Sequence, residues 1–358
     1  MKALIAAGGH ATRLRPITYT INKHLIPLAN RPMIENAIEK IVECGITDIA
    51  INVNPGEQEI QRIVGDGSRW NVRITYLEQV GGAKGIGHTV RNAAQWIGDD
   101  SFVFYLGDNI ILGSIASMYD RFVREEMDCL LALSQVEDPQ RFGVPELKNG
   151  RIVRVHEKPE DPPSPYAVTG IYFFRPVALA AAFEIRPSAR GEYEITDIIN
   201  WLIHRNYVVG YEETIGWWKD TGKPEDLIEG NSLLLDQMAR GKIAPDISVE
   251  EGATFEGNVS IGSGSIIGKD TKIIGPTCIG KGCEIRGGVI GPHVSIGDGV
   301  RIHSTDITTS IVMDGCAITA GPPISGSIFG RNVQATKRVL RADNSHCFLV
   351  GDNTSVEW

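Results

Sequence analysis

The chain has 358 residues, about twice the usual length of one domain, so we expect two domains that each bury a core. Its net charge of −9, with 35 Lys and Arg against 44 Asp and Glu, excludes the broad basic face that a nucleic-acid or anionic-membrane binder needs. The first apolar run ends at Gly8, too short for a secretory signal, and no later run could span a membrane, which predicts a cytoplasmic protein. The six cysteines lack zinc spacing and are predicted to be free thiols.

From Lys2 to about Met238, short β-branched runs alternate with helical ones, a pattern typical of a mainly parallel, Rossmann-like α/β sheet covered by helices. Ligands of such sheets bind at the carboxyl ends of strands, where Gly8-Gly9 and Gly107-Asp108 stand. After Asp138 the strands shorten around a proline-rich loop, which predicts a second lobe closing over the first. The predicted strands are 3–7, 49–53, 73–77, 102–106, 129–136, 151–156 and 167–174, and the predicted helices are 33–43, 57–64, 88–97, 115–125, 177–183, 195–204 and 224–238.

Beyond Pro245 the sequence becomes a hexapeptide array. Branched or aromatic residues recur every six positions from Val249 to Ile285, and the register then slips by one residue to Ile290. Such repeats form a parallel β-helix in which each coil stacks on the last. We interpret the slip at Gly287-Gly288 as a shortened turn, and we place the domain boundary between residues 1–240 and 246–358.

The loop after the first strand is the strongest chemical signal. Gly8-Gly9 is followed by Thr12, Arg13 and Arg15, and Lys23 comes ten residues after Arg13. Backbone N–H groups and guanidiniums in this order suit a polyphosphate. Gly-Gly after a strand can also be an ordinary tight turn, but a turn alone does not need so many donors.

The order Gly8-Gly9-x-x-Thr12-Arg13-Leu14-x-Pro16, Lys23-x-Leu25-x-Pro27, Arg31-Pro32-Met33 resembles the signature of sugar-1-phosphate nucleotidylyltransferases. The whole chain is most similar to the long-form glucose-1-phosphate thymidylyltransferases. This resemblance implies a nucleotide-diphospho-sugar transferase fold followed by a left-handed parallel β-helix. Ala11 departs from the family pattern, which has glycine there, so alanine would be strained if the loop requires a positive φ.

The resemblance also implies roles for individual residues. Arg13, Lys23, Asp108 and Lys158 would be catalytic, and Mg²⁺ would be held by Asp108 and Asp220, because magnesium takes one or two carboxylates and completes its shell with phosphate and water. A capping role for either aspartate is the plain alternative. Nucleotide-binding residues would be Ala7, Gly8, Gly9, Ala11, Thr12, Arg13, Gln79, Gly85 and Asp108; sugar-phosphate-binding residues would be Gly107, Gly143, Glu157, Lys158, Val168, Gly170, Tyr172 and Trp218.

Gln79 has the donor and acceptor that a pyrimidine edge requires, and Gly85 would let the backbone approach the base. The loop around Gly81-Gly82 differs from that of short-form relatives, which leaves thymine and uracil both open. The function expected from the resemblance is synthesis of an NDP-sugar and pyrophosphate, dTDP-glucose above all, from a nucleoside triphosphate and a sugar-1-phosphate, by a cytoplasmic homo-oligomer. Three alternatives remain: a uridylyltransferase, a non-catalytic regulatory or assembly homologue, and a bifunctional enzyme whose His293 or His303 serves acyl transfer in the β-helix.

Overall fold

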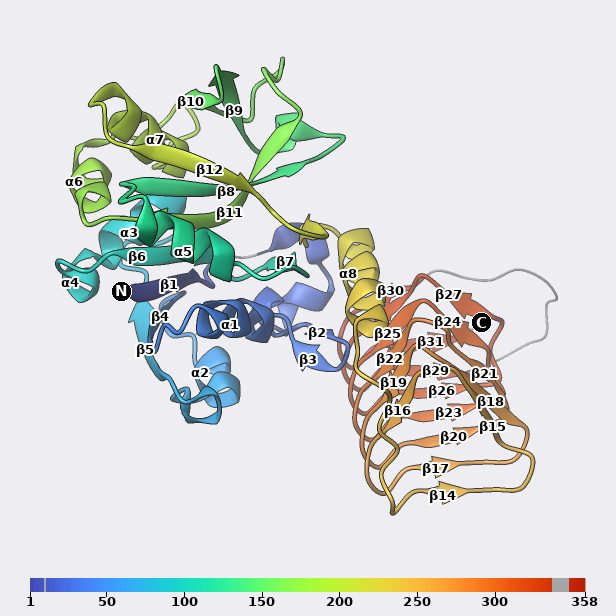
Figure 1. Ribbon diagram of the computed structural model, residues 1–358. Helices are drawn as coiled ribbons and strands as arrows, with labels where there is room; N and C mark the ends of the chain where they lie inside the picture. The colour runs from blue at the N-terminus through green and yellow to red at the C-terminus, as the bar shows by residue number, and fades with distance from the viewer. Residues whose placement is uncertain (10, 337–347, 358) are drawn as a thin grey trace. The chain divides into compact units, whose positions relative to one another are not determined.

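The structure of the protein is a computed structural model that describes residues 1–9, 11–336 and 348–357 (Figure 1). The chain divides into two compact units. The first consists of Met1–Gly9 and Ile34–Asp220, and the second of His10–Met33 and Thr221–Trp358. The predicted boundary at 240–246 lies inside the second unit and stays a prediction. Among the described residues, no helix has the length and apolarity that a bilayer crossing requires.

A seven-stranded mixed sheet forms the centre of the first unit. Its middle strands are continuous apolar runs because both of their faces are covered, as in other α/β sheets. All neighbouring strands are parallel except for the pairs that β11 makes. The strand order is β12 (Val209–Glu213), β8 (Cys129–Gln135), β11 (Tyr166–Phe174), β6 (Phe102–Leu106), β1 (Lys2–Ala6), β4 (Asp48–Val53) and β5 (Arg73–Glu78).

The prediction of a second lobe after Asp138 is wrong for β11. This strand runs antiparallel between β6 and β8, inside the central sheet. All but the first of its residues are buried, as a strand covered on both faces requires. Only the hairpin of β9 (Gly143–Lys148) and β10 (Arg151–Glu157) forms a separate two-stranded sheet in this stretch.

Helices cover both faces of the sheet. In α1, the buried Ile34, Ala37, Ile38 and Ile41 recur at the spacing of one helix face. One face of the sheet packs on α3, α4, α6 and α7 in a single apolar core, and α1 and α5 lie in front of the sheet in Figure 1. The predicted helix 88–97 is two helices that meet at Ala93. The helices are α1 (Ile34–Glu43), α2 (Glu59–Val64), α3 (Ile86–Asn92), α4 (Ala94–Ile97), α5 (Ala116–Arg124), α6 (Val177–Glu184), α7 (Ile195–His204) and α8 (Pro224–Asp236), of which α8 belongs to the second unit.

The second unit contains a parallel β-helix with three sheets, consistent with the predicted left-handed form (Figure 1). Its core is a stack of branched side chains, each paired with the same position of the next coil. The sheets are β14 (Ser248–Val249), β17 (Ile266–Ile267), β20 (Glu284–Arg286), β23 (Arg301–His303), β26 (Ala317–Thr319), β29 (Gln334–Thr336) and β31 (Ser355–Glu357); β15 (Thr254–Glu256), β18 (Thr271–Ile274), β21 (Gly288–Ile290), β24 (Ile307–Thr308) and β27 (Ile324–Ser325); and β16 (Val259–Ile261), β19 (Thr277–Ile279), β22 (Val294–Ile296), β25 (Ser310–Val312), β28 (Ile328–Phe329) and β30 (Leu349–Val350).

The predicted register slip is confirmed as a shortened turn. Ile267 pairs with Ile285, 18 residues later, whereas Ile285 pairs with Ile302, 17 residues later. Gly287, between β20 and β21, and Gly288, the first residue of β21, both have positive φ, at 66° and 89°. A Cβ on Gly288 would lie 2.5 Å from the backbone oxygen of Thr305, so the tight turn depends on glycine there.

The segment His10–Met33 also belongs to the second unit. It contains three short 3₁₀ turns, η1 (Thr12–Leu14), η2 (Ile17–Tyr19) and η3 (Lys23–Leu25), and a small hairpin of β2 (Pro27–Leu28) and β3 (Arg31–Pro32). Both residues of the hairpin turn, Ala29 and Asn30, have left-handed φ values of 48° and 59°. Two left-handed residues give the turn the twist that suits a two-residue hairpin.

Candidate active site

The Gly8-Gly9 turn lies where β1 ends, within the first unit, and it is fixed by Asn54. The N–H of Gly9 donates to Oδ1 of Asn54 at 2.9 Å, and Nδ2 of Asn54 donates back to the carbonyl of Gly9 at 3.0 Å. A Cβ on Gly8 would lie 2.9 Å from Oε1 of Gln79. The predicted phosphate and base residues therefore lie side by side. Ala7 beside them is fully buried. The sequence reasoning missed Asn54, whose only signal is its place just after β4.

Gln79 is oriented by a chain of side-chain amides. Its side chain is 4% exposed, and its Oε1 accepts from Nδ2 of Asn52 at 3.4 Å. Asn92 donates in turn to Oδ1 of Asn52 at 3.2 Å and to the carbonyl of Glu78 at 2.9 Å. A buried amide held in this way has one defined donor and acceptor orientation, as recognition of a base edge requires.

Backbone packing within the protein requires glycine at position 85. With φ at +95°, it passes so close to the 192–194 segment that a Cβ would lie 2.6 Å from the carbonyl oxygen of Tyr193. The N–H of Tyr193 donates to the carbonyl of Lys84 at 2.8 Å. The close approach at Gly85 is therefore to the chain's own backbone, and contact with a base at this position remains a prediction.

The cationic segment belongs to the second unit and begins with a left-handed residue. Ala11 has φ 42° and ψ 49°, so the loop adopts a left-handed conformation at this position. The glycine of the family pattern would adopt this conformation without strain. Oγ1 of Thr18 donates to the carbonyl of Ala11 at 2.9 Å, and Thr12 and Arg13 form η1 directly after it. His10 lies outside the described residues.

Lys23 stands at the start of η3, where Asn22 caps the turn by accepting from the N–H of His24 at 3.0 Å. Lys23 is only 9% exposed, unusually buried for a lysine. Arg15 has a different environment, because its guanidinium stacks on the exposed ring of Tyr19 at 4.8 Å. Arg15 therefore has a protein partner within the same segment.

The strand register places two aspartates one position apart just after β6. Asp108 follows β6 directly, and Asp220 ends β13 (Trp218–Asp220), which pairs antiparallel with β7 (Asn109–Ile111). In that register Asp220 lies opposite Asn109, the residue after Asp108. The N–H of Lys223 at the start of α8 donates to Oδ2 of Asp226 at 2.9 Å, and a capping role for Asp220 stays an untested alternative. Gly107, beside Asp108, donates its N–H to the carbonyl of Ala6.

This pair fits a magnesium ion by the chemistry of its donors. One carboxylate from the turn before β7 and one from the end of β13, the strand paired with β7, would supply the one or two protein oxygens that Mg²⁺ takes when phosphates complete its shell. A preformed cluster of three or more metal-ligating side chains is absent from the described residues. The site would therefore depend on the nucleotide for its remaining ligands.

A charged group forms where β10 ends. Oε1 of Glu157 lies 3.7 Å from Nζ of Lys158 and 3.7 Å from a guanidinium nitrogen of Arg190, and Oε2 accepts from Oγ1 of Thr196 at 3.2 Å. Burial, together with the charge of Glu194, raises the pKa of Glu157 above its usual value although the two cations oppose this shift. Lys158 itself has φ 44°, a strained value for a non-glycine residue.

Arg190 is the residue of this group that the sequence reasoning missed. It is held by Glu194, at 3.2 Å, and by Glu192, at 2.7 Å, and it places a second cation beside Lys158. Glu194 stands at the N-cap of α7 but makes no capping hydrogen bond through its side chain. Its oxygens bind Arg190 and the hydroxyl of Ser188 instead.

The remaining predicted sugar residues surround a bulge in β11. Gly170 has φ +80°, and a Cβ there would overlap the Asn109 side chain, so this glycine makes room for a protein group. Nε1 of Trp218 and Nδ2 of Asn109 both donate to the carbonyl of Thr169, at 3.0 and 2.7 Å. Phe142 packs edge-on against Trp218, beside Gly143.

Tyr172 and Val168 are members of the core. The Tyr172 ring stacks on Phe104 and Phe174, and burial raises the pKa of its phenol strongly, with a smaller contribution from Glu157. The ring of Tyr172 is thus packed in the core of the sheet. Contact of Tyr172 or Val168 with a sugar remains a prediction.

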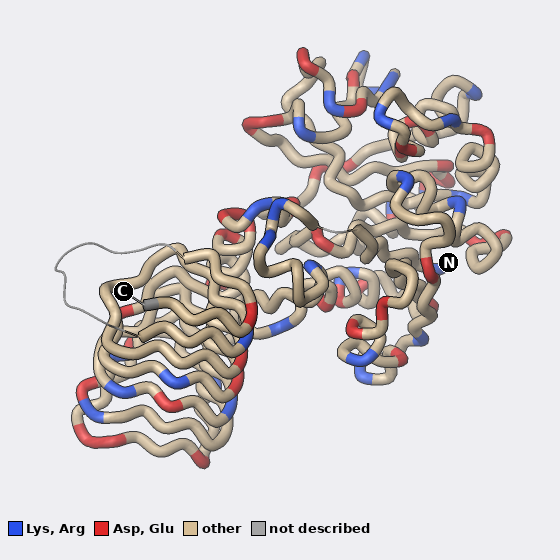
Figure 2. The backbone as a smooth tube through the Cα atoms, turned by 180° about the vertical axis from the view of Figure 1, so that it is seen from behind, with Lys and Arg blue, Asp and Glu red and all other residues tan. Residues whose placement is uncertain are grey.

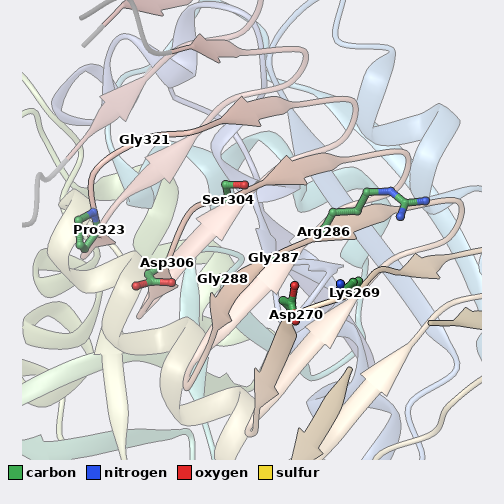
Figure 3. Close-up of a pocket in the computed structure, with 9 residues that line it drawn as sticks. All are labelled: Lys269, Asp270, Arg286, Gly287, Gly288, Ser304, Asp306, Gly321 and Pro323. Atoms are coloured by element: carbon green, nitrogen blue, oxygen red, sulfur yellow. The ribbon is translucent and has the colours of Figure 1, made fainter. Parts of the chain in front are cut away.

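The β-helix carries a hollow of about 500 Å³ on its own surface (Figure 3). Four charged residues line it, Lys269, Asp270, Arg286 and Asp306. Arg286 binds Glu284 and Glu250, and Asp306 accepts from the N–H of Val289. Figure 2 shows charges of both signs intermixed along the coils. His293, one candidate base for acyl transfer, is paired with Asp236 at 2.9 Å. An acyl-transfer role for His293 or His303 stays an untested alternative.

Comparison with known proteins agrees with this geometry. Residues 2–237 match the family model described as nucleotidyl transferase. A glucose-1-phosphate thymidylyltransferase of Streptomyces antibioticus is 42% identical over 100% of this chain and 99% of its own. A low-salt glycan biosynthesis nucleotidyltransferase of Haloferax volcanii is 35% identical over the full length of both chains.

Two solved structures of nucleotidyltransferases are also similar to this chain. A crystal structure described as a glucose-1-phosphate thymidylyltransferase of Bacillus anthracis, in complex with sucrose, is 40% identical, with a TM-score of 0.63 over 68% of this chain and 98% of that chain. A UDP-glucose pyrophosphorylase complexed with UDP-glucose is 26% identical, with a TM-score of 0.58 over 66% of this chain and 99% of that chain.

Proposed function

The chain belongs to the nucleotidyl transferase family, and we propose on that premise that it joins a nucleoside triphosphate to a sugar-1-phosphate. The products are an NDP-sugar and pyrophosphate. An oxygen of the sugar phosphate attacks the α-phosphorus in line, and the bond from that phosphorus to the oxygen bridging to the β-phosphate breaks, so that pyrophosphate leaves with the electron pair. dTTP and glucose-1-phosphate are the proposed substrates, in line with the name of the Streptomyces relative.

The observation that carries the proposal is the pairing of β7 with β13. It brings Asp220 opposite the residue that follows Asp108, at the carboxyl end of a central strand. Nucleotidyl transfer uses carboxylates in such a place to hold a magnesium ion. When bound, Mg²⁺ on Asp108 and Asp220 would neutralise phosphate charge.

The other residues take roles by charge and position. Lys158, beside Glu157 and Arg190, would bind the attacking phosphate, and Glu157 would bind sugar hydroxyls. Arg13 and Lys23 would stabilise the leaving pyrophosphate, a task of electrostatic stabilisation that needs no proton transfer. Gln79, held by Asn52, would bind the base edge.

One experiment tests the activity and its main alternative together. Pyrophosphate release is measured over a grid of dTTP, UTP, ATP and GTP against several hexose-1-phosphates. We expect the highest kcat/KM with dTTP and glucose-1-phosphate. Preference for UTP would replace the proposal by its uridylyltransferase alternative. A grid without pyrophosphate release would favour the regulatory or assembly homologue.

The role of Arg13 has a matched control two residues away. Arg13→Ala should lower the single-turnover rate by about 10²- to 10³-fold with a smaller change in nucleotide affinity, the usual cost of removing one group that stabilises transition-state charge. Arg15→Ala removes an arginine stacked on Tyr19 and should change the rate only a few-fold. An unchanged single-turnover rate in Arg13→Ala would rule out this role.

The proposal extends to a cytoplasmic homo-oligomer assembled through the β-helix. The coils stack along one axis and leave flanks suited to symmetric contact. Light scattering of the full chain gives the subunit number, and a monomer at working concentration would refute the assembly.

A further inference from the structure

The hairpin of β2 and β3 is attached to the β-helix by buried hydrogen bonds within the second unit. The N–H of Ala29, in its turn, donates to Oδ1 of Asn231 on α8 at 2.8 Å. The same oxygen accepts from the hydroxyl of Ser295, on β22, at 2.6 Å. Nδ2 of Asn30 reaches the β-helix directly and donates to the carbonyl of Ile296 at 2.6 Å.

The environment of these bonds makes them costly to lose. Asn231 is 1% exposed and Ser295 is fully buried, so neither group can turn to solvent when its partner is removed. The hydroxyl of Ser295 also accepts from the thiol of Cys278, one coil away, at 3.4 Å. Asn231 therefore joins three elements, the hairpin, α8 and the β-helix, through one oxygen atom.

The hairpin belongs to the same segment as the two proposed pyrophosphate ligands. Lys23 lies four residues before Pro27, and the buried turn η3 and residue Ile26 fill that interval. The N–H of Met33 donates to the carbonyl of Ile26 at 3.2 Å and closes the base of the hairpin. A shift of the hairpin tip would therefore move Lys23 with it.

A second contact between this segment and the β-helix lies nearer to Arg13. A Cβ on Gly351, which follows β30, would lie 3.3 Å from Pro16. Pro16 is three residues from Arg13 and leads into η2. The β-helix thus touches the segment on both sides of η2, close to each of its two proposed functional cations.

We propose that Asn231 and Ser295 are positioning residues for nucleotidyl transfer: they fix the β2–β3 hairpin on the β-helix and thereby hold Lys23 and Arg13 in their working conformation. This inference rests on the proposed function for the roles of the two cations. It gives the β-helix a part in the chemistry of the chain, in addition to assembly.

The test compares two variants that break the attachment from opposite sides. Ser295→Ala removes the hydroxyl on the β-helix side. Asn30→Gly removes the amide that reaches Ile296 and keeps the left-handed φ of the turn. Ser265→Ala is the matched control, because Ser265 is also a fully buried serine of the β-helix, hydrogen-bonded to Gly280 and Cys283 of the β-helix itself.

Two readouts are measured on the full chain. Hydrogen–deuterium exchange of the peptide covering residues 26–32 should become about tenfold faster in both variants. In Ser295→Ala the side-chain amide of Asn231 loses the hydroxyl that fixes it, and in Asn30→Gly the hairpin loses its bond to Ile296. The single-turnover rate should fall by about tenfold, while the KM for the sugar-1-phosphate stays within about twofold. Ser265→Ala should change neither readout, although its melting temperature should fall as far as that of Ser295→Ala.

The outcomes separate this inference from the proposed function. Exchange and turnover in Ser295→Ala equal to those of Ser265→Ala would refute the positioning role. Faster exchange with an unchanged rate in both test variants would also refute it, because the attachment would then be structural only. A wild-type chain that releases no pyrophosphate on the substrate grid refutes the proposed function, while the exchange result still decides whether the attachment holds the hairpin.

Discussion

The seven-stranded sheet and the β-helix use the same apolar residue types in two different ways. Each strand of the sheet has its own sequence. In the first unit, proposed functional residues stand where strands end: Gly8 and Asp108 after β1 and β6 of this sheet, and Glu157 and Asp220 at the ends of β10 and β13. In the β-helix, each coil repeats the last, and a column of branched residues from Ile267 to Ile318 fills the interior. In the first unit, the proposed functional residues lie where the hydrogen bonding of a strand stops. In the β-helix, the repeated strands stabilise the fold.

This difference predicts that a carboxylate matters to activity where a strand of the first unit ends, and not in the turns of the β-helix. Asp108→Asn or Asp220→Asn should lower the single-turnover rate by about 10²- to 10³-fold and raise the Mg²⁺ concentration needed for half-maximal rate, because one anionic oxygen ligand is lost. Asp298→Asn alters a carboxylate that accepts from the N–H of Lys281 in a β-helix turn and should leave the rate unchanged. Full activity in Asp108→Asn would break the comparison.

A second prediction concerns position along the β-helix. Ile302→Ala, in the fully buried column, should lower the free energy of unfolding by about 2–5 kcal/mol, because the coils above and below cannot close the cavity. Val249→Ala lies in the same column at the first coil, where the side chain is 46% exposed, and should cost less than about 1 kcal/mol. Calorimetry of both variants measures this difference, and equal losses would contradict a core whose coils depend on their neighbours.

The contrast also explains what could be predicted from sequence. The β-helix, including its shortened turn at Gly287-Gly288, follows from a period that each coil repeats, so local pattern and final structure agree. In the sheet, most strand and helix positions were predicted, but β11 was assigned to a second lobe. The apolar sequence of β11 indicates that both of its faces are buried, but it does not identify the strands that pair with it.

The candidate site was predictable only in part for a similar reason. Strand ends located Gly8, Asp108 and Asp220, and resemblance supplied their roles. Arg190 and Asn54 could not be found in this way, because each acts through a loop that the tertiary fold brings to Glu157 or to Gly9. The attachment of the β2–β3 hairpin to Ser295 was invisible for the same reason, since Ser295 looks like any small residue of a repeat.

A smaller effect should appear in the pH dependence of stability. Because the folded pKa of Glu157 is raised by burial, its contribution is most favourable below the ordinary pKa of a glutamate and is lost as pH rises through the raised value. Glu157→Gln removes this dependence. Relative to the variant, the wild type should therefore lose stability between about pH 4 and neutral pH, measured as free energy of unfolding in urea. A constant difference over that range would contradict the shift.

The smallest expected effect concerns Ala11, the one departure from the family pattern. Its left-handed φ of 42° costs an alanine about 1–2 kcal/mol, and glycine relieves this strain while losing about 0.5–1 kcal/mol to the entropy of the unfolded chain. Ala11→Gly should therefore raise the free energy of unfolding by up to about 1 kcal/mol. Ala317→Gly, in the extended strand β26, should lower it by about 0.5–1 kcal/mol. Changes of opposite sign in the free energy of thermal unfolding would show that the loop needs the left-handed conformation at Ala11. A loss of stability in both variants would show that Ala11 is unstrained.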